Sequence, residues 1–210
     1  MSKTIENLEW RYATKRFDAA KKLSEDQMEV LKDSINLSPT SYGLQLFKVL
    51  IIQDEQLKSK LRPLCWNQPQ LEEASHIFVF CNHTQVNRDE LDGYIKRKAK
   101  AHKIEVDNLN GYADFIEGKM KEKSQSEIEA WTAKQTYIAA SNLMLTAAEL
   151  KIDSCPMEGF ENKPVNKLLK LEAKNLNAAL IVTVGFRSAE DPILGKPKVR
   201  KSDEELFELI

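Results

Sequence analysis

The sequence lacks the short motifs that identify several large enzyme classes. It contains no G-x-S-x-G, no P-loop and no G-x-G-x-x-G segment. A serine hydrolase, a P-loop NTPase and a Rossmann domain therefore lose their usual sequence support. Its histidines, His76, His83 and His102, have no metal-ligand spacing with one another or with acidic residues. We expect no metal site and interpret these histidines as structural or exposed. If the protein is an enzyme, a bound cofactor is expected to carry the chemistry.

Cysteines and long apolar runs are also scarce. Cys65, Cys81 and Cys155 are an odd number without C-x-x-C spacing. They indicate neither a disulfide framework nor a zinc site, and they fit a reducing cytoplasm. The first residues lack the apolar core of a signal peptide. The longest uncharged run, residues 135–148, is too short and too polar to span a bilayer. We therefore expect a cytoplasmic protein with no membrane partner.

No charge of either sign is in excess. The 31 Lys and Arg residues against 32 Asp and Glu residues give a formal net charge of −1, whereas nucleic-acid-binding domains normally carry a basic excess. The hydrophobic content of 42% and charged content of 30% are typical of a soluble globular protein. A length of 210 residues allows one substantial core. We predict a single domain over residues 1–210 with no nucleic-acid partner.

Two local basic clusters nevertheless lie near the ends of this near-neutral chain. The first, R-Y-A-T-K-R-F-D, occupies residues 11–18, and the second, K-P-K-V-R-K, occupies residues 196–201. Either cluster alone is typical of a solvated surface, but Arg and Lys presented together can also bind a phosphate. Two uncharged polar turns, residues 38–45 and 67–70, lie between them. We hypothesise that these four segments close on one phosphorylated cofactor.

Hydrophobic periodicity predicts the remaining elements. Ser24 with Gln27, and Ser124 with Glu127, form capping-box patterns that open two helices, and Asn67 is a candidate helix cap. The predicted helices cover residues 4–12, 24–38, 54–61, a segment after 67, 124–150 and a segment from 164. The predicted strands cover residues 46–53, 75–82, 152–157 and 178–186, and the first two are expected to be mostly buried. Gly159 is expected at a tight turn or a close backbone approach.

Two segments fall outside this predicted core. The polar residues 86–123 are expected to form a pair of surface helices, interrupted at 107–111, which either cover a site as a lid or are simply solvated. Their aromatic residues, Tyr94, Tyr112 and Phe115, favour the lid. Residues 187–210 contain no convincing core element, which is unusual inside a compact domain. This tail is therefore either disordered or laid across something else, such as a second subunit. Small residues on the long helix allow core packing or a subunit interface.

Five segments together resemble a known family. They are Arg11–Phe17, Ser38–Gln45, Asn67–Gln70, Pro156–Gly159 and Lys198–Arg200, and they occur in the same order in the nitroreductase family of FMN-dependent NAD(P)H oxidoreductases. The chain looks most like the branch of oxygen-insensitive nitroreductases and flavin or dihydropteridine reductases. The resemblance implies an α+β fold with a central, mostly antiparallel sheet flanked by helices. It also implies a homodimer with FMN at the subunit interface, a C-terminal tail reaching onto the partner, and sites built from both subunits.

The resemblance assigns the cofactor-binding residues by position. At the FMN phosphate it places Arg11, Tyr12, Ala13, Lys198 and Arg200. At the polar edge of the isoalloxazine it places Lys15 and Asn67, and it places Gln70 near the flavin or the nicotinamide phosphate. Along the ring and ribityl chain it places Thr40, Ser41, Tyr42, Gln45 and Gln135. Along one face of the flavin it places Pro156, Met157, Glu158 and Gly159, with a backbone N–H near Glu158 or Gly159 donating to flavin N5.

The implied activity is a ping-pong hydride transfer from NAD(P)H through tightly bound FMN to a small acceptor, such as a nitroaromatic, a quinone, an activated enone, free flavin or a pterin. No side-chain acid or base is required. Lys15 and the backbone of Glu158 would tune the flavin, because donors aimed at developing negative charge stabilise it. Gln70 replaces a lysine common in relatives and Ala13 replaces a serine. Both departures leave cofactor affinity, redox potential and the choice between NADH and NADPH open.

Other readings of the same residues remain. The protein could bind FMN or another phosphorylated ligand without turnover, or it could be a flavin-fragmenting or dehalogenating relative. A storage protein needs the phosphate clamp but not donors at the ring edge. Retention of Lys15, Asn67 and the Glu158–Gly159 pair therefore favours the oxidoreductase.

Overall fold

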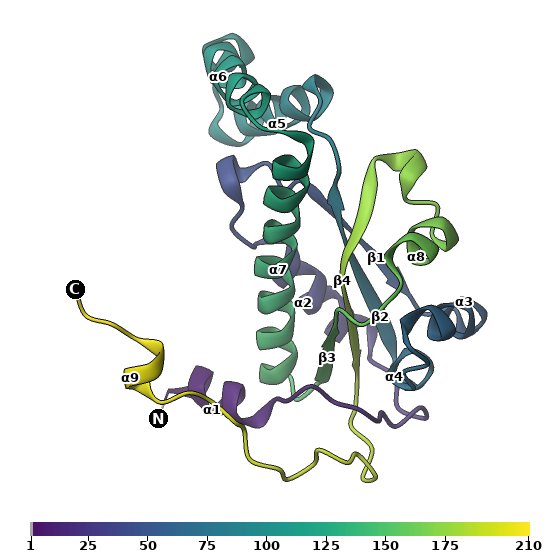
Figure 1. Cartoon of the computed structure of the whole chain (residues 1–210). Helices are drawn as coiled ribbons and strands as arrows, with labels where there is room; N and C mark the ends of the chain where they lie inside the picture. Colours follow the sequence, from purple (N-terminus) through teal and green to yellow (C-terminus); the bar gives the residue numbers. More distant parts are fainter. Residues whose placement is uncertain (1) are drawn as a thin grey trace.

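The computed structural model describes residues 2–210, and a four-stranded antiparallel sheet lies at its centre (Figure 1). The strand order is β1-β2-β4-β3, with β1 at Phe47–Ile52, β2 at His76–His83, β3 at Asp153–Met157 and β4 at Leu176–Gly185. The inner strands β2 and β4 are mostly buried because both of their edges are paired and both of their faces are covered. The predicted α+β architecture with a central antiparallel sheet is confirmed.

Helices cover both faces of the sheet (Figure 1). One face carries α2 (Glu25–Asn36) and α7 (Gln125–Glu149), and the other carries α3 (Glu55–Leu61), α4 (Gln70–Glu73) and α8 (Asn162–Leu168). Side chains of β2 alternate between these layers, as the two-residue period of a strand requires. Phe78 and Phe80 pack with Leu143 of α7, whereas Ile77 packs in a second core with Leu61 of α3.

The remaining helices lie beyond the ends of α7 (Figure 1). They are α1 (Lys3–Trp10), α5 (Arg88–His102), α6 (Asn110–Lys121) and α9 (Asp203–Leu206). Short 3₁₀ turns occur elsewhere in the chain: η1 (Ser41–Gly43), η2 (Arg62–Cys65), η3 (Val106–Leu109) and η4 (Glu172–Lys174). The expected surface pair is α5 and α6. A small core of its own, containing Leu44, Leu91 and Ile116, joins this pair to the segment before β1. No helix within residues 2–210 has the length and apolar character needed to cross a bilayer.

Local sequence signals place most helix starts correctly. The Gln27 N–H donates to Ser24 Oγ at 3.2 Å and the Ser24 N–H donates to Gln27 Oε1 at 3.0 Å, and Ser124 with Glu127 forms the same reciprocal box. The prediction that Asn67 caps the next helix is wrong. Asn67 has a φ of 54° and its N–H bonds back to the Arg62 carbonyl at 3.1 Å, so it ends the preceding turn.

The first strand and the C-terminal tail also differ from a buried core. The prediction that β1 is mostly buried is wrong, since Ile52 is its one fully buried side chain and Ile51 is 39% exposed. The reason is that β1 lies at an edge of the sheet and its side chains line two open grooves. Beyond β4 the chain runs over the outside of the molecule to α9. The large apolar side chains within residues 203–210 are all exposed: Leu206, Phe207, Leu209 and Ile210.

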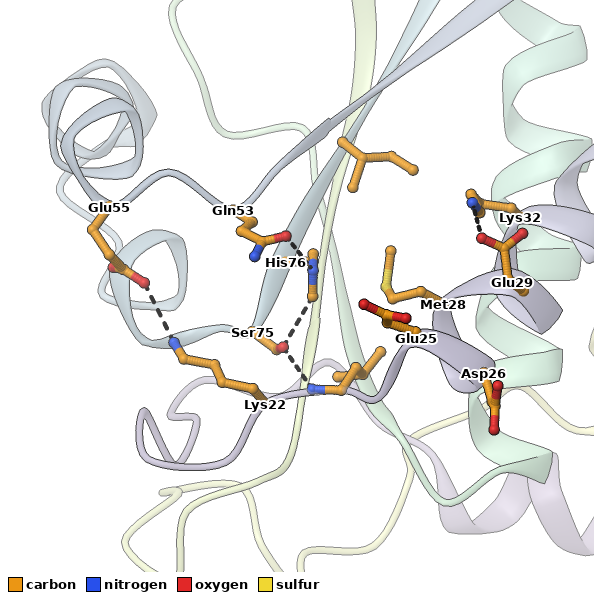
Figure 2. Close-up of a pocket in the computed structure, with 12 residues that line it drawn as sticks. Lys22, Glu25, Asp26, Met28, Glu29, Lys32, Gln53, Glu55, Ser75 and His76 are labelled. Atoms are coloured by element: carbon orange, nitrogen blue, oxygen red, sulfur yellow. Dashed lines mark hydrogen bonds and ion pairs between the residues drawn. The ribbon is translucent and has the colours of Figure 1, made fainter.

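A groove of about 760 Å³ opens between α2 and the starts of β2 and α3. Figure 2 shows His76 on one wall of it, held between Ser75 and Gln53. His76 Nδ1 lies 2.9 Å from Ser75 Oγ, and its Nε2 lies 3.2 Å from Gln53 Oε1. Burial, followed by the charges of Lys58 and Lys22, lowers the pKa of His76. The folded protein therefore favours the neutral imidazole, which fits a structural role for His76.

The burial of Leu143 generates a stability prediction. Its side chain on α7 is fully buried against the sheet, and truncating such a leucine removes packing and leaves a cavity. Leu143→Ala is expected to lower the free energy of unfolding by about 2–5 kcal/mol, measured by urea denaturation at one fixed protein concentration. The matched control is Leu37→Ala, where the leucine is 81% exposed, with an expected change below about 0.5 kcal/mol. Equal effects of the two substitutions would contradict the assigned packing.

The environment of His76 generates a pH prediction. An unfolded histidine titrates near pH 6.5, and the folded pKa of His76 is lower. Between these two values the unfolded state binds more protons, so the free energy of unfolding falls as pH decreases through about 6.5. Urea midpoints at pH 7.5 and pH 5.5 should differ less in His76→Gln than in the wild type. His102→Gln, which alters an exposed histidine, should keep the wild-type difference. An unchanged acid dependence in His76→Gln would refute the assignment.

Candidate functional site

The first basic cluster leaves α1 as an irregular segment and runs beside β3. Ala13 forms an isolated parallel bridge with Ser154, and the Thr14 N–H donates to the Ser154 carbonyl at 3.4 Å. Phe17 forms an antiparallel bridge with Arg187 beyond the end of β4. The predicted loop conformation of this segment is confirmed, and its path brings residues 11–15 alongside β3.

Cations from both ends of the chain meet there. The Lys198 ammonium donates to the Arg11 carbonyl. Burial lowers the pKa of Arg11, and the positive charge of Arg200 lowers it further. Burial, Arg11 and Arg200, in that order, lower the pKa of Lys198. The structure therefore brings together the three cations that the resemblance assigned to a phosphate, with Tyr12 and Ala13 directly following Arg11.

This cationic cluster is short of hydrogen-bond acceptors. Nε and Nη2 of Arg11 are buried, and no acceptor for them exists among the residues that the structure describes. The adjacent carboxylate of Asp153 is already taken by Arg187, whose Nε donates to Oδ1 at 2.6 Å. A buried, unpaired guanidinium is costly, and a phosphate would supply the missing acceptors. These orphaned donors fit the FMN phosphate.

Lys15 and Gln70 converge on Cys155 of β3. Lys15 Nζ lies 4.0 Å and Gln70 Nε2 lies 3.9 Å from Cys155 Sγ. Burial raises the pKa of the Cys155 thiol more than Lys15 lowers it, so the sulfur is a neutral, weak acceptor. Asp191 fixes this part of the chain, because its Oδ2 accepts the N–H groups of Lys15 at 2.6 Å and Arg16 at 2.9 Å. Both side chains therefore retain donors beyond this weak contact, with Lys15 half-buried and Gln70 buried.

The turn after β3 approaches the segment that contains Asn67. A Cβ on Gly159 would lie 2.7 Å from Trp66 Cε3, so the expected close approach at Gly159 is confirmed. Gln68 Nε2 donates to the Gly159 carbonyl at 3.0 Å. Within residues 2–210 the N–H groups of Glu158 and Gly159 donate no hydrogen bond. The preceding Pro156 is half-buried and Met157 is buried, which leaves the two free N–H groups at the surface beside Asn67.

The hydroxyl-rich segment before β1 belongs to another neighbourhood. The Ser41 N–H donates to Gln135 Oε1 at 2.8 Å, and Gln135 Nε2 donates to Ser41 Oγ at 3.2 Å. Tyr42 has a φ of 57° and makes edge contacts with Phe115 at 6.5 Å and Trp131 at 6.2 Å between ring centroids. Gln135 thus contacts the segment that the resemblance assigned with it to the flavin ring and ribityl chain, and Phe115 connects this segment to α6.

Thr40 and Gln45 close the base of the same segment. Thr40 Oγ1 accepts the Gln45 N–H at 3.1 Å. Gln45 Nε2 donates to the Asn36 carbonyl at 2.7 Å, so the amide of Gln45 is directed at the end of α2. In this chain Gln45 therefore supports the turn that carries Ser41 and Tyr42.

Helix α7 separates the two neighbourhoods. Gln135 faces Ser41, whereas Tyr137, two residues later, donates from its hydroxyl to Glu158 Oε1. Side chains two residues apart on an α-helix are rotated by about 200° around the helix axis, so they point to nearly opposite sides. Within one chain, residues 40–45 with Gln135 therefore do not line the same cavity as residues 11–15, 67–70, 156–159 and 198–200.

Sequence reasoning missed three side chains that shape these neighbourhoods: Asp191, Tyr137 and Trp131. Asp191 follows β4 in a segment with no periodic pattern, so no sequence signal marks it. Tyr137 and Trp131 lie on the predicted long helix, where their spacing from Gln135 could have indicated their faces. No group of three or more metal-binding side chains occurs in the described part of the chain.

Comparison with known proteins identifies relatives of this chain. Residues 8–186 match the Nitroreductase family. The chain is 34% identical over 212 residues to "Putative NAD(P)H nitroreductase YfkO" of Bacillus subtilis, covering 96% of this chain and 94% of that protein. A similar relative, "Putative NAD(P)H nitroreductase SAUSA300_2462" of Staphylococcus aureus, is 34% identical over 223 residues and covers 100% and 97% of the two chains.

The fold is shared with a solved structure. A protein of Exiguobacterium sibiricum, described as a putative nitroreductase in complex with FMN, superposes with a TM-score of 0.88 at 19% identity, covering 100% of this chain and 98% of that chain. At this identity the likeness establishes the fold. Together with the family match over most of the chain and the curated relatives, it leads to one conclusion: this protein belongs to the nitroreductase family.

Proposed function

We propose that this protein is an FMN-dependent NAD(P)H oxidoreductase that reduces small acceptors, with nitroaromatics and quinones as the expected classes. The observation that carries the proposal is the half-buried Arg11, whose buried Nε and Nη2 lack acceptors beside Lys198 and Arg200. The names of the curated relatives and the FMN complex of a structural relative support the same cofactor and the same electron donor.

Each part of the described site would have a separate task. Arg11, Lys198 and Arg200 would bind the FMN phosphate. Lys15 and Gln70 would donate to the polar edge of the ring, and the free N–H groups of Glu158 and Gly159 would donate at N5. When bound, FMN supplies the hydride acceptor and donor. The chain's own contribution is to orient the ring and to place positive charge and donors where negative charge develops.

A second subunit would complete the site. Residues 40–45 and Gln135 lie on the opposite side of α7 from the cation cluster, so they could line an FMN site only on a partner. The exposed Leu206, Phe207, Leu209 and Ile210 support the same proposal, because they give the tail an apolar surface to bury. We therefore propose a homodimer in which the tail of one chain covers the other.

The α5–α6 pair is the proposed lid. Its Phe115 contacts Tyr42 edge to face, which joins the pair to the segment that would contribute to the partner's flavin. We keep the cytoplasm as the proposed location, since Cys65, Cys81 and Cys155 are all free thiols.

Two alternatives make different use of the same residues. A protein that stores FMN without turnover would need the phosphate cluster but not Lys15, Gln70 and the free N–H groups of the turn. Those donors favour an oxidoreductase. A flavin or dihydropteridine reductase would use the same cofactor site and differ in the acceptor, which makes it a narrower form of the proposed activity.

The proposed function is tested by the visible spectrum of the purified protein under anaerobic conditions. Flavin bands that bleach on addition of NADH or NADPH are expected, and the faster nucleotide identifies the donor. Bound flavin that stays oxidised with both nucleotides would support storage. A colourless protein that ignores added FMN would overturn the cofactor assignment.

The cation cluster generates a binding prediction. Arg200→Ala removes one positive charge next to Arg11 and is expected to weaken FMN binding by about 1.5–3 kcal/mol, the usual range for a hydrogen bond to a charged group. Fluorescence titration of the apoprotein with FMN measures the dissociation constant. Lys201→Ala removes the same charge from the adjacent exposed position and should leave the constant within about twofold of wild type. Equal constants for Arg200→Ala and wild type would remove Arg200 from the phosphate site.

A further inference from the structure

The turn after β3 is held from two sides. On one side, the Trp66 ring packs against Gly159 and Gln68 donates to the Gly159 carbonyl at 3.0 Å. On the other side, Tyr137 of α7 donates its phenolic O–H to Glu158 Oε1 at 2.5 Å. The Phe160 N–H closes the turn by donating to the Glu158 carbonyl at 2.9 Å. Tyr137 thus supplies the contact that fixes the Glu158 side chain.

The hydroxyl of Tyr137 is a persistent donor. Burial and the neighbouring Glu158 carboxylate raise the pKa of Tyr137 to about 12, so the phenol keeps its proton at neutral pH. Tyr137 is 41% exposed, and Glu158 Oε1 is the partner of its hydroxyl.

The pair lies next to the peptide groups that the proposed function uses. The N–H groups of Glu158 and Gly159 are unpaired within residues 2–210. The carboxylate that Tyr137 binds belongs to the side chain of the first of these residues, Glu158. Hydride addition places negative charge on the ring, which a free carboxylate nearby would oppose. A phenol that binds this carboxylate restrains it and disperses part of its charge.

We propose that Tyr137 is a positioning residue, which holds the Glu158 carboxylate against α7 and so fixes the Glu158–Gly159 peptide for the flavin and favours its reduced state. This role rests on the proposed function. Tyr137 would touch neither FMN nor the acceptor, and it would act through Glu158.

The test is the midpoint potential of the bound FMN in Tyr137→Phe, which removes the hydroxyl and keeps the ring. The affinity for reduced relative to oxidised FMN should fall about tenfold, which lowers the potential of a two-electron couple by about 30 mV. Ser34→Ala removes a hydroxyl that donates to the Leu31 carbonyl within α2 at 2.8 Å, and it should leave the potential unchanged.

Glu158→Gln supplies a second and independent measurement. It removes the carboxylate charge, so it should shift the potential in the opposite direction, and Tyr137→Phe should then add no further shift. An unchanged potential in Tyr137→Phe with FMN bound would overturn the role. The same shift of Tyr137→Phe in the Glu158→Gln background would also overturn it, since Tyr137 would then act independently of Glu158.

The proposed function and the proposed role of Tyr137 can be disproved separately. Wild-type protein that binds no FMN would overturn the proposed function and this role with it. Wild-type protein that binds FMN and is reduced by NAD(P)H, with an unchanged potential in Tyr137→Phe, would overturn this role alone. If Tyr137→Phe loses its fold, as judged by circular dichroism, an unchanged potential in Glu158→Gln overturns the role.

Discussion

The unpaired positive charge around Arg11 is the constraint on which the rest of the site depends. A guanidinium with two buried nitrogens and no acceptor raises the energy of the folded protein, and Lys198 and Arg200 increase the repulsion. The carboxylates near this charge already have other partners. Asp153, the carboxylate that could neutralise it, is bound by Arg187, and Asp191 is bound by backbone N–H groups. The unsatisfied donors are therefore a built feature that favours an anionic ligand.

Helix α7 gives this arrangement its geometry. Its buried face packs on the sheet through Leu143, and two of its polar side chains, Gln135 and Tyr137, organise different surroundings on opposite sides. Helix α7 thus contacts both the turn that follows β3, through Tyr137, and the segment that precedes β1, through Gln135. This separation is the basis of the proposal that the two groups of residues contribute to sites shared between two chains.

Much of the fold could be predicted from the sequence because its signals are local. Capping boxes at Ser24 and Ser124 fix helix starts, and continuous apolar runs rich in β-branched residues identify the inner strands. Asn67 was misjudged as a cap because its left-handed conformation depends on the preceding turn. The burial of β1 was overestimated because an edge strand and an inner strand have similar composition. The five motifs identified the family, but the contacts of Asp191 and Tyr137 connect residues distant in sequence and leave no periodic trace.

The cation cluster also constrains the order in which the fold can assemble. Arg11 precedes the sheet in sequence, whereas Lys198 and Arg200 follow its last strand, β4. The contact between Lys198 and Arg11 joins residues 187 positions apart. Because loop-closure entropy grows with the length of the loop, we expect this contact to form after the sheet has brought the two flanking segments together. The proposed phosphate site would then be lost when either flanking segment detaches, even if the sheet stays intact.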